Sequence, residues 1–169
     1  MGKDASTRAT FLAKHLNVEI GLNLRSNRWP GADFWARRGE KGLTLEAVLD
    51  RSEVVAVGID GGGLDDLFGL CVLGREKETK RWLAWCHAWA HEGVLERRKS
   101  IATALRDFER EGSLTVVDDE LADILEMIEI INTVKQRGLL ASVACDPAGL
   151  GEFVEIFSGW FDFQSRQST

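Results

Sequence analysis

The chain has 169 residues, of which 44% are hydrophobic and 28% are charged, and its formal net charge is −6. This length suits about one domain, and the composition is typical of a globular protein with a substantial core. No apolar run approaches the roughly 20 residues that a membrane span requires, and no apolar stretch follows a basic N-terminus as in a signal peptide. We therefore expect a cytoplasmic protein with no membrane partner.

The charge is unevenly distributed along the chain. Residues 111–169 carry three basic and eleven acidic side chains, whereas residues 51–110 carry ten of each. The overall charge argues weakly against a general nucleic-acid binder, but the middle segment holds a basic run, Arg97, Arg98 and Lys99. Such a run is commonly a solvated helix face, and it is also a candidate contact for phosphate groups.

Residues 1–50 are expected to form an arm or linker with one or two short helices. Apolar residues are irregularly spaced there and are interrupted by a proline and several glycines, apart from a helical stretch near Thr44–Leu49. The composition changes just after this segment. We therefore place one domain at residues 51–158 and a short tail at residues 159–169.

Three consecutive strands are predicted to open the domain. Apolar and β-branched residues fill Glu53–Asp60 almost continuously, which is typical of a strand buried on both faces. Leu67–Gly74 and Arg81–Ala90 are further strand-like runs, and the links between the three are a glycine turn and a charged hairpin tip. Links this short predict an antiparallel meander.

Helices and strands then alternate. Apolar residues recur at helical spacing over His91–Glu111 and Asp118–Arg137, and a further helix is predicted over Gly149–Phe157. Short strands are predicted at Leu114–Val117 and Leu140–Cys145. With right-handed crossovers, this order predicts an α/β fold with an RNase H-like mixed sheet, in which the meander is followed by alternating helices and parallel strands and the first strand is central.

Two aspartates lie at the ends of predicted strands. Asp60 ends the first strand and Asp146 follows the last. If both strands are central and parallel, their C-terminal ends lie side by side, at the edge where open α/β sheets bind ligands. Carboxylates there suit hard divalent cations, and two such ions can activate a water for phosphodiester hydrolysis. A single aspartate at a strand end is also a common cap, so the pair carries the prediction; Asp65 and Asp66 could reach the same place.

Three segments resemble the nuclease domain of phage terminase large subunits, the motors that package viral DNA and cut it. They are VAVGIDGGGLDDLFGL at residues 55–70, RWLAWCHAWAHEGVLERR at residues 81–98 and SVACDPAGLG at residues 142–151. In that family an aspartate ends the first nuclease strand, a second commonly follows six positions later, and a further acid begins a D-P-x-G-like turn. The matching positions are Asp60, Asp66 and Asp146.

The resemblance implies a metal-dependent DNA endonuclease encoded by a phage or prophage and acting in the bacterial cytoplasm. Asp60 and Asp146 would be catalytic, and together with Asp66 they would hold Mg²⁺ or Mn²⁺ in a two-metal site. The basic run would contact double-stranded DNA. Other packaging proteins are expected partners, and the chain could form a homo-oligomer through an exposed strand edge.

Two departures from the family pattern bear on activity. No G-x-x-x-x-G-K-[ST] loop is present for an ATPase half. The family's last metal-binding acid comes from a C-terminal segment that the tail FSGWFDFQSRQST does not resemble, and nothing in the setting of Asp162 identifies it as a substitute. We therefore expect a C-terminally truncated nuclease domain with an incomplete metal site and weak or lost catalysis.

Two alternatives stay open. A catalytically incomplete prophage remnant could act only as a binding or assembly module. GIDGGG also resembles the phosphate-binding loop of sugar kinases with an actin-like fold, but Asp65 and Asp66 would place negative charge where the phosphate should approach. Cleavage of plasmid DNA separates the nuclease from both alternatives, and binding of ATP identifies the kinase.

The remaining reactive residues favour structural roles. Cys71, Cys86 and Cys145 lack the CxxC spacing of a zinc site and suggest no disulfide framework, so they are expected to be buried free thiols. His87 and His91 are expected to form a hydrogen-bonded pair at the end of the sheet rather than a metal site.

Overall fold

A computed structural model describes residues 34, 37–61, 66–119, 121–145 and 155–159. The chain divides into two compact units, Met1–Gly42 and Leu43–Thr169. Helix α3 (Leu45–Arg51), all but the last residue of which lies in the segment expected to form an arm, belongs to the second unit. None of the described helices is long and apolar enough to span a membrane.

The described elements of the second unit agree closely with the predicted ones. After α3 they are β1 (Ser52–Gly61), β2 (Phe68–Glu76), β3 (Trp82–His91), α4 (Glu92–Arg97), α5 (Lys99–Arg110), β4 (Leu114–Val117), α6 (Ala122–Gln136) and β5 (Leu140–Cys145). Residues 155–159 are also helical. Every predicted strand is present. The helix predicted over His91–Glu111 is instead two helices, because Arg98 leaves the helical region with φ −101° and ψ 53°.

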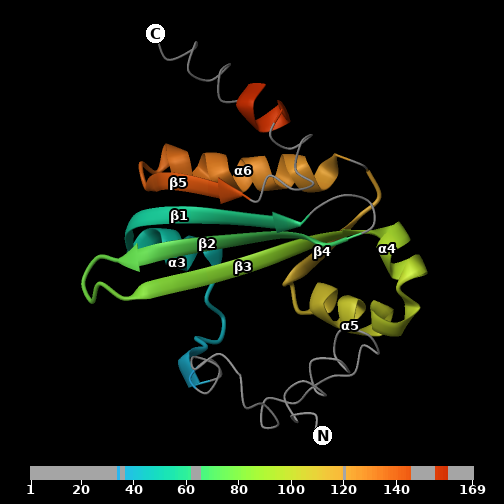
Figure 1. Cartoon of the computed structure of the whole chain (residues 1–169). Coiled ribbons are helices and arrows are strands. Elements are labelled where there is room, and N and C mark those ends of the chain that lie inside the picture. Colours follow the sequence, from blue (N-terminus) through green and yellow to red (C-terminus); the bar gives the residue numbers. More distant parts are fainter. Residues whose placement is uncertain (1–33, 35–36, 62–65, 120, 146–154, 160–169) are drawn as a thin grey trace, which may run out of the picture. The chain divides into compact units, whose positions relative to one another are not determined.

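The described strands form one five-stranded mixed sheet in the order β4-β3-β2-β1-β5 (Figure 1). β1, β2 and β3 are antiparallel neighbours, β5 is parallel to β1, and β4 is parallel to β3. This confirms the predicted α/β class, a meander followed by alternating helices and parallel strands, and it is compatible with an RNase H-like fold. The condition that both strands leading to the aspartates are central holds for β1 but not for β5, which is an edge strand because it pairs only with β1 among the described strands.

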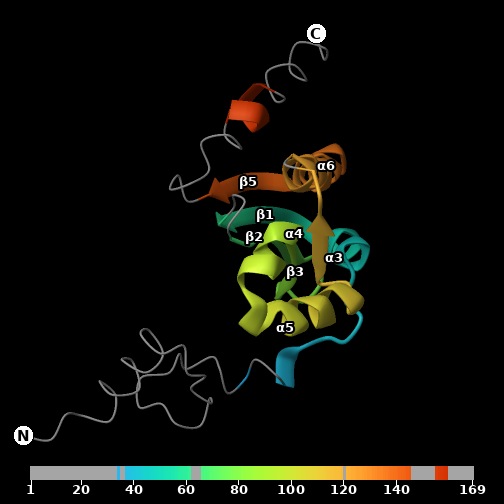
Figure 2. The same ribbon diagram turned by 90° about the vertical axis from the view of Figure 1, so that its right-hand side faces the viewer.

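One face of the sheet carries the main core. Successive side chains of a strand point to opposite faces, and in β1 the residues Val55, Val57 and Ile59 are at most 4% exposed. They pack with the buried side chains of α3 and α6 in a single cluster. Figure 2 shows both helices on the same side of the sheet. Burying side chains of this size stabilises a fold by roughly 1.5–3 kcal/mol each.

The other face is covered only in part. The second core cluster consists of Ala90 and Leu114 from the strands with Val94, Leu95 and Leu105 from α4 and α5. It therefore covers the end of β3 and strand β4. The rest of this face is called the open face. Around Cys71 and Cys86 it carries mostly small side chains, among them Gly58, Gly69 and Ala144, and forms the hollow described below.

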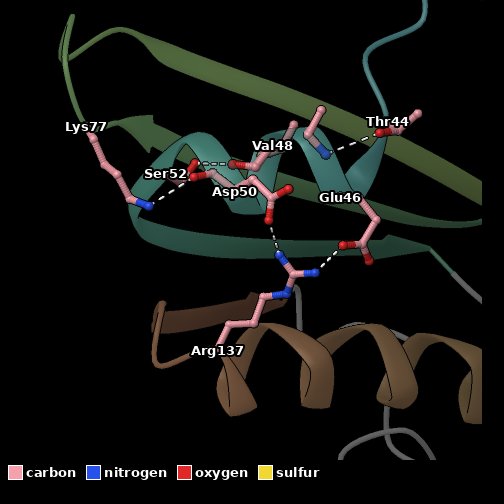
Figure 3. A network of polar contacts seen from close by, with 8 residues as sticks. Thr44, Glu46, Val48, Asp50, Ser52, Lys77 and Arg137 are labelled. Carbon is pink, nitrogen blue, oxygen red and sulfur yellow. Dashed lines mark hydrogen bonds and ion pairs between the residues drawn. The ribbon is translucent and has the colours of Figure 1, made fainter.

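Polar contacts join α3 to the end of α6 (Figure 3). Thr44 caps α3 by accepting a hydrogen bond from the Ala47 N–H at 3.2 Å. Arg137, which follows α6, donates to Asp50 at 2.6 Å and also pairs with Glu46. The hydrogen bond to Asp50 is the main reason why the pKa of Arg137 is raised. These contacts are exposed, so they orient the helices and add little to the free energy of unfolding.

A close approach of helix to strand requires glycine at position 74. A Cβ atom there would lie 2.0 Å from Ser52 Oγ and 3.0 Å from Val48 Cγ1, whereas a Cβ at Gly58 would meet nothing within 4 Å. Ser52 is fully buried and donates from Oγ to the Val48 carbonyl oxygen at 2.6 Å, so it cannot move aside freely.

We predict that Gly74→Ala lowers the free energy of unfolding by about 1–3 kcal/mol, the usual cost of overpacking a core. The matched substitution Gly58→Ala in β1 should leave it nearly unchanged. Urea unfolding followed by circular dichroism measures both. Equal effects of the two substitutions would contradict the predicted contact between β2 and α3.

Candidate functional site

The turn after β1 brings two predicted site residues to one corner of the sheet. Gly61 has φ +78°, and a Cβ on it would lie 2.3 Å from the Leu67 carbonyl oxygen, so only glycine fits. The two ends of the connection between β1 and β2 therefore touch. Asp60 is the chain neighbour of Gly61 and Asp66 is the chain neighbour of Leu67, and both aspartates are exposed.

Asp66 also contacts the predicted DNA-binding run. Its Oδ1 accepts a hydrogen bond from the Leu67 N–H at 2.9 Å and lies 3.5 Å from Nη1 of Arg98. The Asp66 and Arg98 side chains are 61% and 46% exposed, so the ion pair is solvated and a competing ligand of either group could replace it. The structure thus brings a predicted metal ligand and a predicted phosphate contact together.

The basic run occupies the junction of two helices. Arg97 ends α4, Arg98 lies between the helices and Lys99 begins α5, and all three are exposed. Arg106 of α5 holds the junction by donating to Glu92 of α4 at 2.6 Å. The run is therefore solvated, and it lies at the corner between two helices with Arg98 beside Asp66.

The other predicted catalytic residue, Asp146, directly follows the last described residue of β5. β1 and β5 pair in parallel up to Ile59 and Cys145, and the next residues along the two strands are Asp60 and Asp146. Asp146 lies outside the described residues, as do Asp65 and Asp162. The proximity of Asp60 and Asp146 therefore stays a prediction.

The described residues supply only part of a metal site. They contain no group of three or more His, Cys, Asp or Glu side chains that could hold a metal ion. Asp60 and Asp66 offer carboxylate oxygens, the donors that Mg²⁺ and Mn²⁺ prefer. The donor chemistry fits these ions, and a third carboxylate would have to come from outside the described ranges.

A hollow of about 540 Å³ lies on the open face next to Asp60. Cys71, Cys86 and Cys145 all line it. The expectation of buried thiols is wrong: Cys86 and Cys145 are exposed and Cys71 is half-buried. Alternation along an apolar strand does not reveal which face a helix will cover. The register and the helix positions show that Cys71 and Cys86 share the open face, whereas Cys145 at the end of β5 is the register partner of Ile59 on the inner face.

The two histidines of β3 have separate partners, so the predicted hydrogen-bonded pair is wrong. His87 Nε2 lies 2.9 Å from Thr115 Oγ1, and His91 Nε2 lies 3.3 Å from Asp123 Oδ2. Residues four apart on a strand are about 13 Å apart, too far for a hydrogen bond. The His87 ring also stacks on Trp85 at 5.6 Å, and burial lowers its pKa.

Comparisons with known proteins do not place the chain in a family. No model of a protein family matches the chain, and no curated protein is significantly similar to it. Among solved structures, the crystal structure of the HK97 bacteriophage large terminase is similar, with a TM-score of 0.48 and 19% sequence identity. The similarity covers 93% of this chain and 38% of the terminase, so the chain spans well under half of that protein.

Burial of His87 predicts a loss of stability in acid. The unfolded chain binds a proton at this residue near pH 6.5, whereas the folded protein binds it only at lower pH. Stability is therefore fully present above pH 6.5 and is lost as the pH falls through and below that value. The urea concentration at the midpoint of unfolding should fall between pH 7 and pH 5, and it should fall less in the His87→Gln variant. An equal fall in both proteins would show that His87 does not contribute.

Proposed function

We propose that this chain is a metal-dependent DNA endonuclease domain of the terminase type, which hydrolyses phosphodiester bonds. The observation that carries the proposal is the parallel register of β1 and β5. It extends to Ile59 and Cys145, so the two strands end at the same edge of the sheet. Asp60 and Asp146 are the next residues of the two strands, and consecutive Cα atoms are only about 3.8 Å apart.

Asp60, Asp66 and Asp146 would hold one or two Mg²⁺ or Mn²⁺ ions. When bound, these ions would supply water activation and charge stabilisation at the phosphate. The contact between Gly61 and Leu67 supports the participation of Asp66, because it closes the connection that separates Asp66 from Asp60. Neighbouring carboxylates repel one another, so without a cation they should oppose folding and with one they should favour it.

The basic run would place the DNA. Arg98 already lies 3.5 Å from Asp66, so a phosphate bound by Arg97, Arg98 or Lys99 would lie beside the carboxylates. Phosphate contacts carry little sequence information, so we expect binding without sequence preference. Release of counterions makes such binding fall steeply with salt.

A binding or assembly module without catalysis is the second candidate. It is favoured by the absence, within the described ranges, of a three-ligand metal group. Both candidates use the basic run, so DNA binding does not separate them. Metal binding and DNA cleavage do.

Metal binding should raise the thermal stability of the full chain. We expect millimolar Mn²⁺ to raise the melting temperature, and Asp60→Asn to remove this rise. Arg98→Gln should strengthen Mn²⁺ binding, because it frees the Asp66 carboxylate. Glu78→Gln, at the hairpin between β2 and β3, is the matched control and should respond like the parent. A parent protein that is insensitive to Mn²⁺ and Mg²⁺ would count against the site.

Nuclease activity should be weak and should favour Mn²⁺, which tolerates imperfect oxygen sites better than Mg²⁺ does. We expect Asp60→Asn and Asp146→Asn each to reduce nicking of plasmid DNA by more than roughly 100-fold. Loss of a residue that only supports a metal ligand typically costs about 10- to 100-fold, and these residues would be ligands themselves. Replacing one side chain of the basic run should instead weaken DNA binding. It should also lower, by about 1, the slope of the logarithm of the binding constant against the logarithm of the salt concentration. If both aspartate variants cut like the parent, the cleavage comes from elsewhere. If the parent and all the variants bind DNA but none of them cuts it, the binding module is favoured.

A further inference from the structure

Cys71 and Cys86 face each other across β2 and β3. They are direct register partners in the antiparallel ladder. In such a ladder, hydrogen-bonded and non-hydrogen-bonded residue pairs alternate. The Glu76 N–H donates to the Arg81 carbonyl at 2.8 Å, which makes Glu76 and Arg81 a hydrogen-bonded pair. The cysteine pair lies five positions further along, an odd number, so it is a non-hydrogen-bonded pair.

A second hydrogen bond supports this assignment. The Ala88 N–H donates to the Ser113 carbonyl at 3.1 Å, toward β4. Backbone groups of alternate residues point to opposite sides of a strand. The N–H and C=O groups of Cys86, two residues before Ala88, therefore also point away from β2.

The spacing of such a pair suits a disulfide. Non-hydrogen-bonded partners have Cα atoms about 4.5 Å apart. This lies within the roughly 4.4–6.8 Å that disulfides span. The two strands are therefore close enough for a disulfide to join Cys71 to Cys86.

The two thiols are also open to small reagents. Cys71 lies opposite Gly58 of β1, and alanines at positions 84 and 88 flank Cys86 on the same face. Both sulfur groups line the open hollow, with Cys86 exposed and Cys71 half-buried. No bulky side chain at these neighbouring positions shields the pair.

The thiols differ in reactivity because they hydrogen-bond to each other. This bond lowers the pKa of Cys86 to about 6 and raises the pKa of Cys71, whose half-burial raises it further. Cys86 is also the more exposed of the two, so it is the thiol that ionises and meets a reagent more readily, and the thiolate is the nucleophilic form of cysteine.

We propose that Cys71 and Cys86 form a dithiol modification site that reacts with low-molecular-weight disulfides and closes to a cross-strand disulfide. The Cys86 thiolate attacks one sulfur of the reagent, forms a mixed disulfide and releases the first reagent thiolate. The Cys71 thiol then loses its proton to solvent, and its sulfur attacks the Cys86 sulfur and releases the second thiolate. Two protein thiols are oxidised, one reagent disulfide is reduced to two thiolates, and the protons of the two cysteines pass to the solvent.

The test uses the full chain with Cys145→Ser, so that only the pair can react with dithiobis(nitrobenzoate). We expect two nitrothiobenzoate ions to be released per chain, no adduct to remain, and the protein to lose two hydrogens by mass spectrometry. Dithiothreitol should reverse the change. An adduct retained on either cysteine, or no reaction, would overturn the proposal.

Two further variants in the same background assign the roles. Adding Cys71→Ser should trap a stable mixed disulfide on Cys86, because the resolving thiol is gone. Adding Cys86→Ser should slow the reaction at pH 7 by roughly tenfold or more, because Cys71 is mostly protonated. Equal rates for the two variants would contradict the assignment of Cys86 as the attacking thiol. Circular dichroism checks that both variants remain folded.

Discussion

The position of β1 between two strands and under two helices is the constraint on which the rest of the sheet depends. Its backbone is paired with β2 on one side and with β5 on the other, and its inner face packs under α3 and α6. A slip of one residue would turn Val55, Val57 and Ile59 to the open face and expose them. The register of β1 is therefore strongly determined, and with it the position of Asp60 at the end of the strand on the open face.

The two faces of the sheet divide stability from chemistry. The inner face is closed by apolar contacts and by two contacts to α6 from β3. The Trp89 indole N–H donates to Glu126 at 2.6 Å, and His91 lies against Asp123 in a nearly fully buried pair. Removing one member of such a buried pair leaves the other without its partner, which is costly. The part of the open face near the end of β1 has mostly small side chains, so Asp60, Cys71 and Cys86 line one hollow there.

The corner that joins Asp66 to Arg98 links parts of the chain that are far apart in the sequence. The break between α4 and α5 places Arg98 outside helical geometry, and its guanidinium reaches the start of β2. An unbroken helix over this segment would carry Arg98 along its regular surface instead. The proposed metal ligands and the proposed phosphate contacts are therefore neighbours because of a local departure from the helix that the sequence pattern predicts.

Local patterns in the sequence were enough to predict the strands, the class of the sheet and the location of Asp60 at a strand end. Continuous apolar runs and helical stripes report the conformation of their own residues, and those predictions hold to within a few residues. Only the tertiary structure decided how the strands and side chains are paired. It determined the pairing of β4 with β3, the edge position of β5, the separate partners of the two histidines and the shared open face of Cys71 and Cys86. Each of these depends on contacts between segments distant in the chain, and periodicity within one segment carries no information about which other segment will cover it.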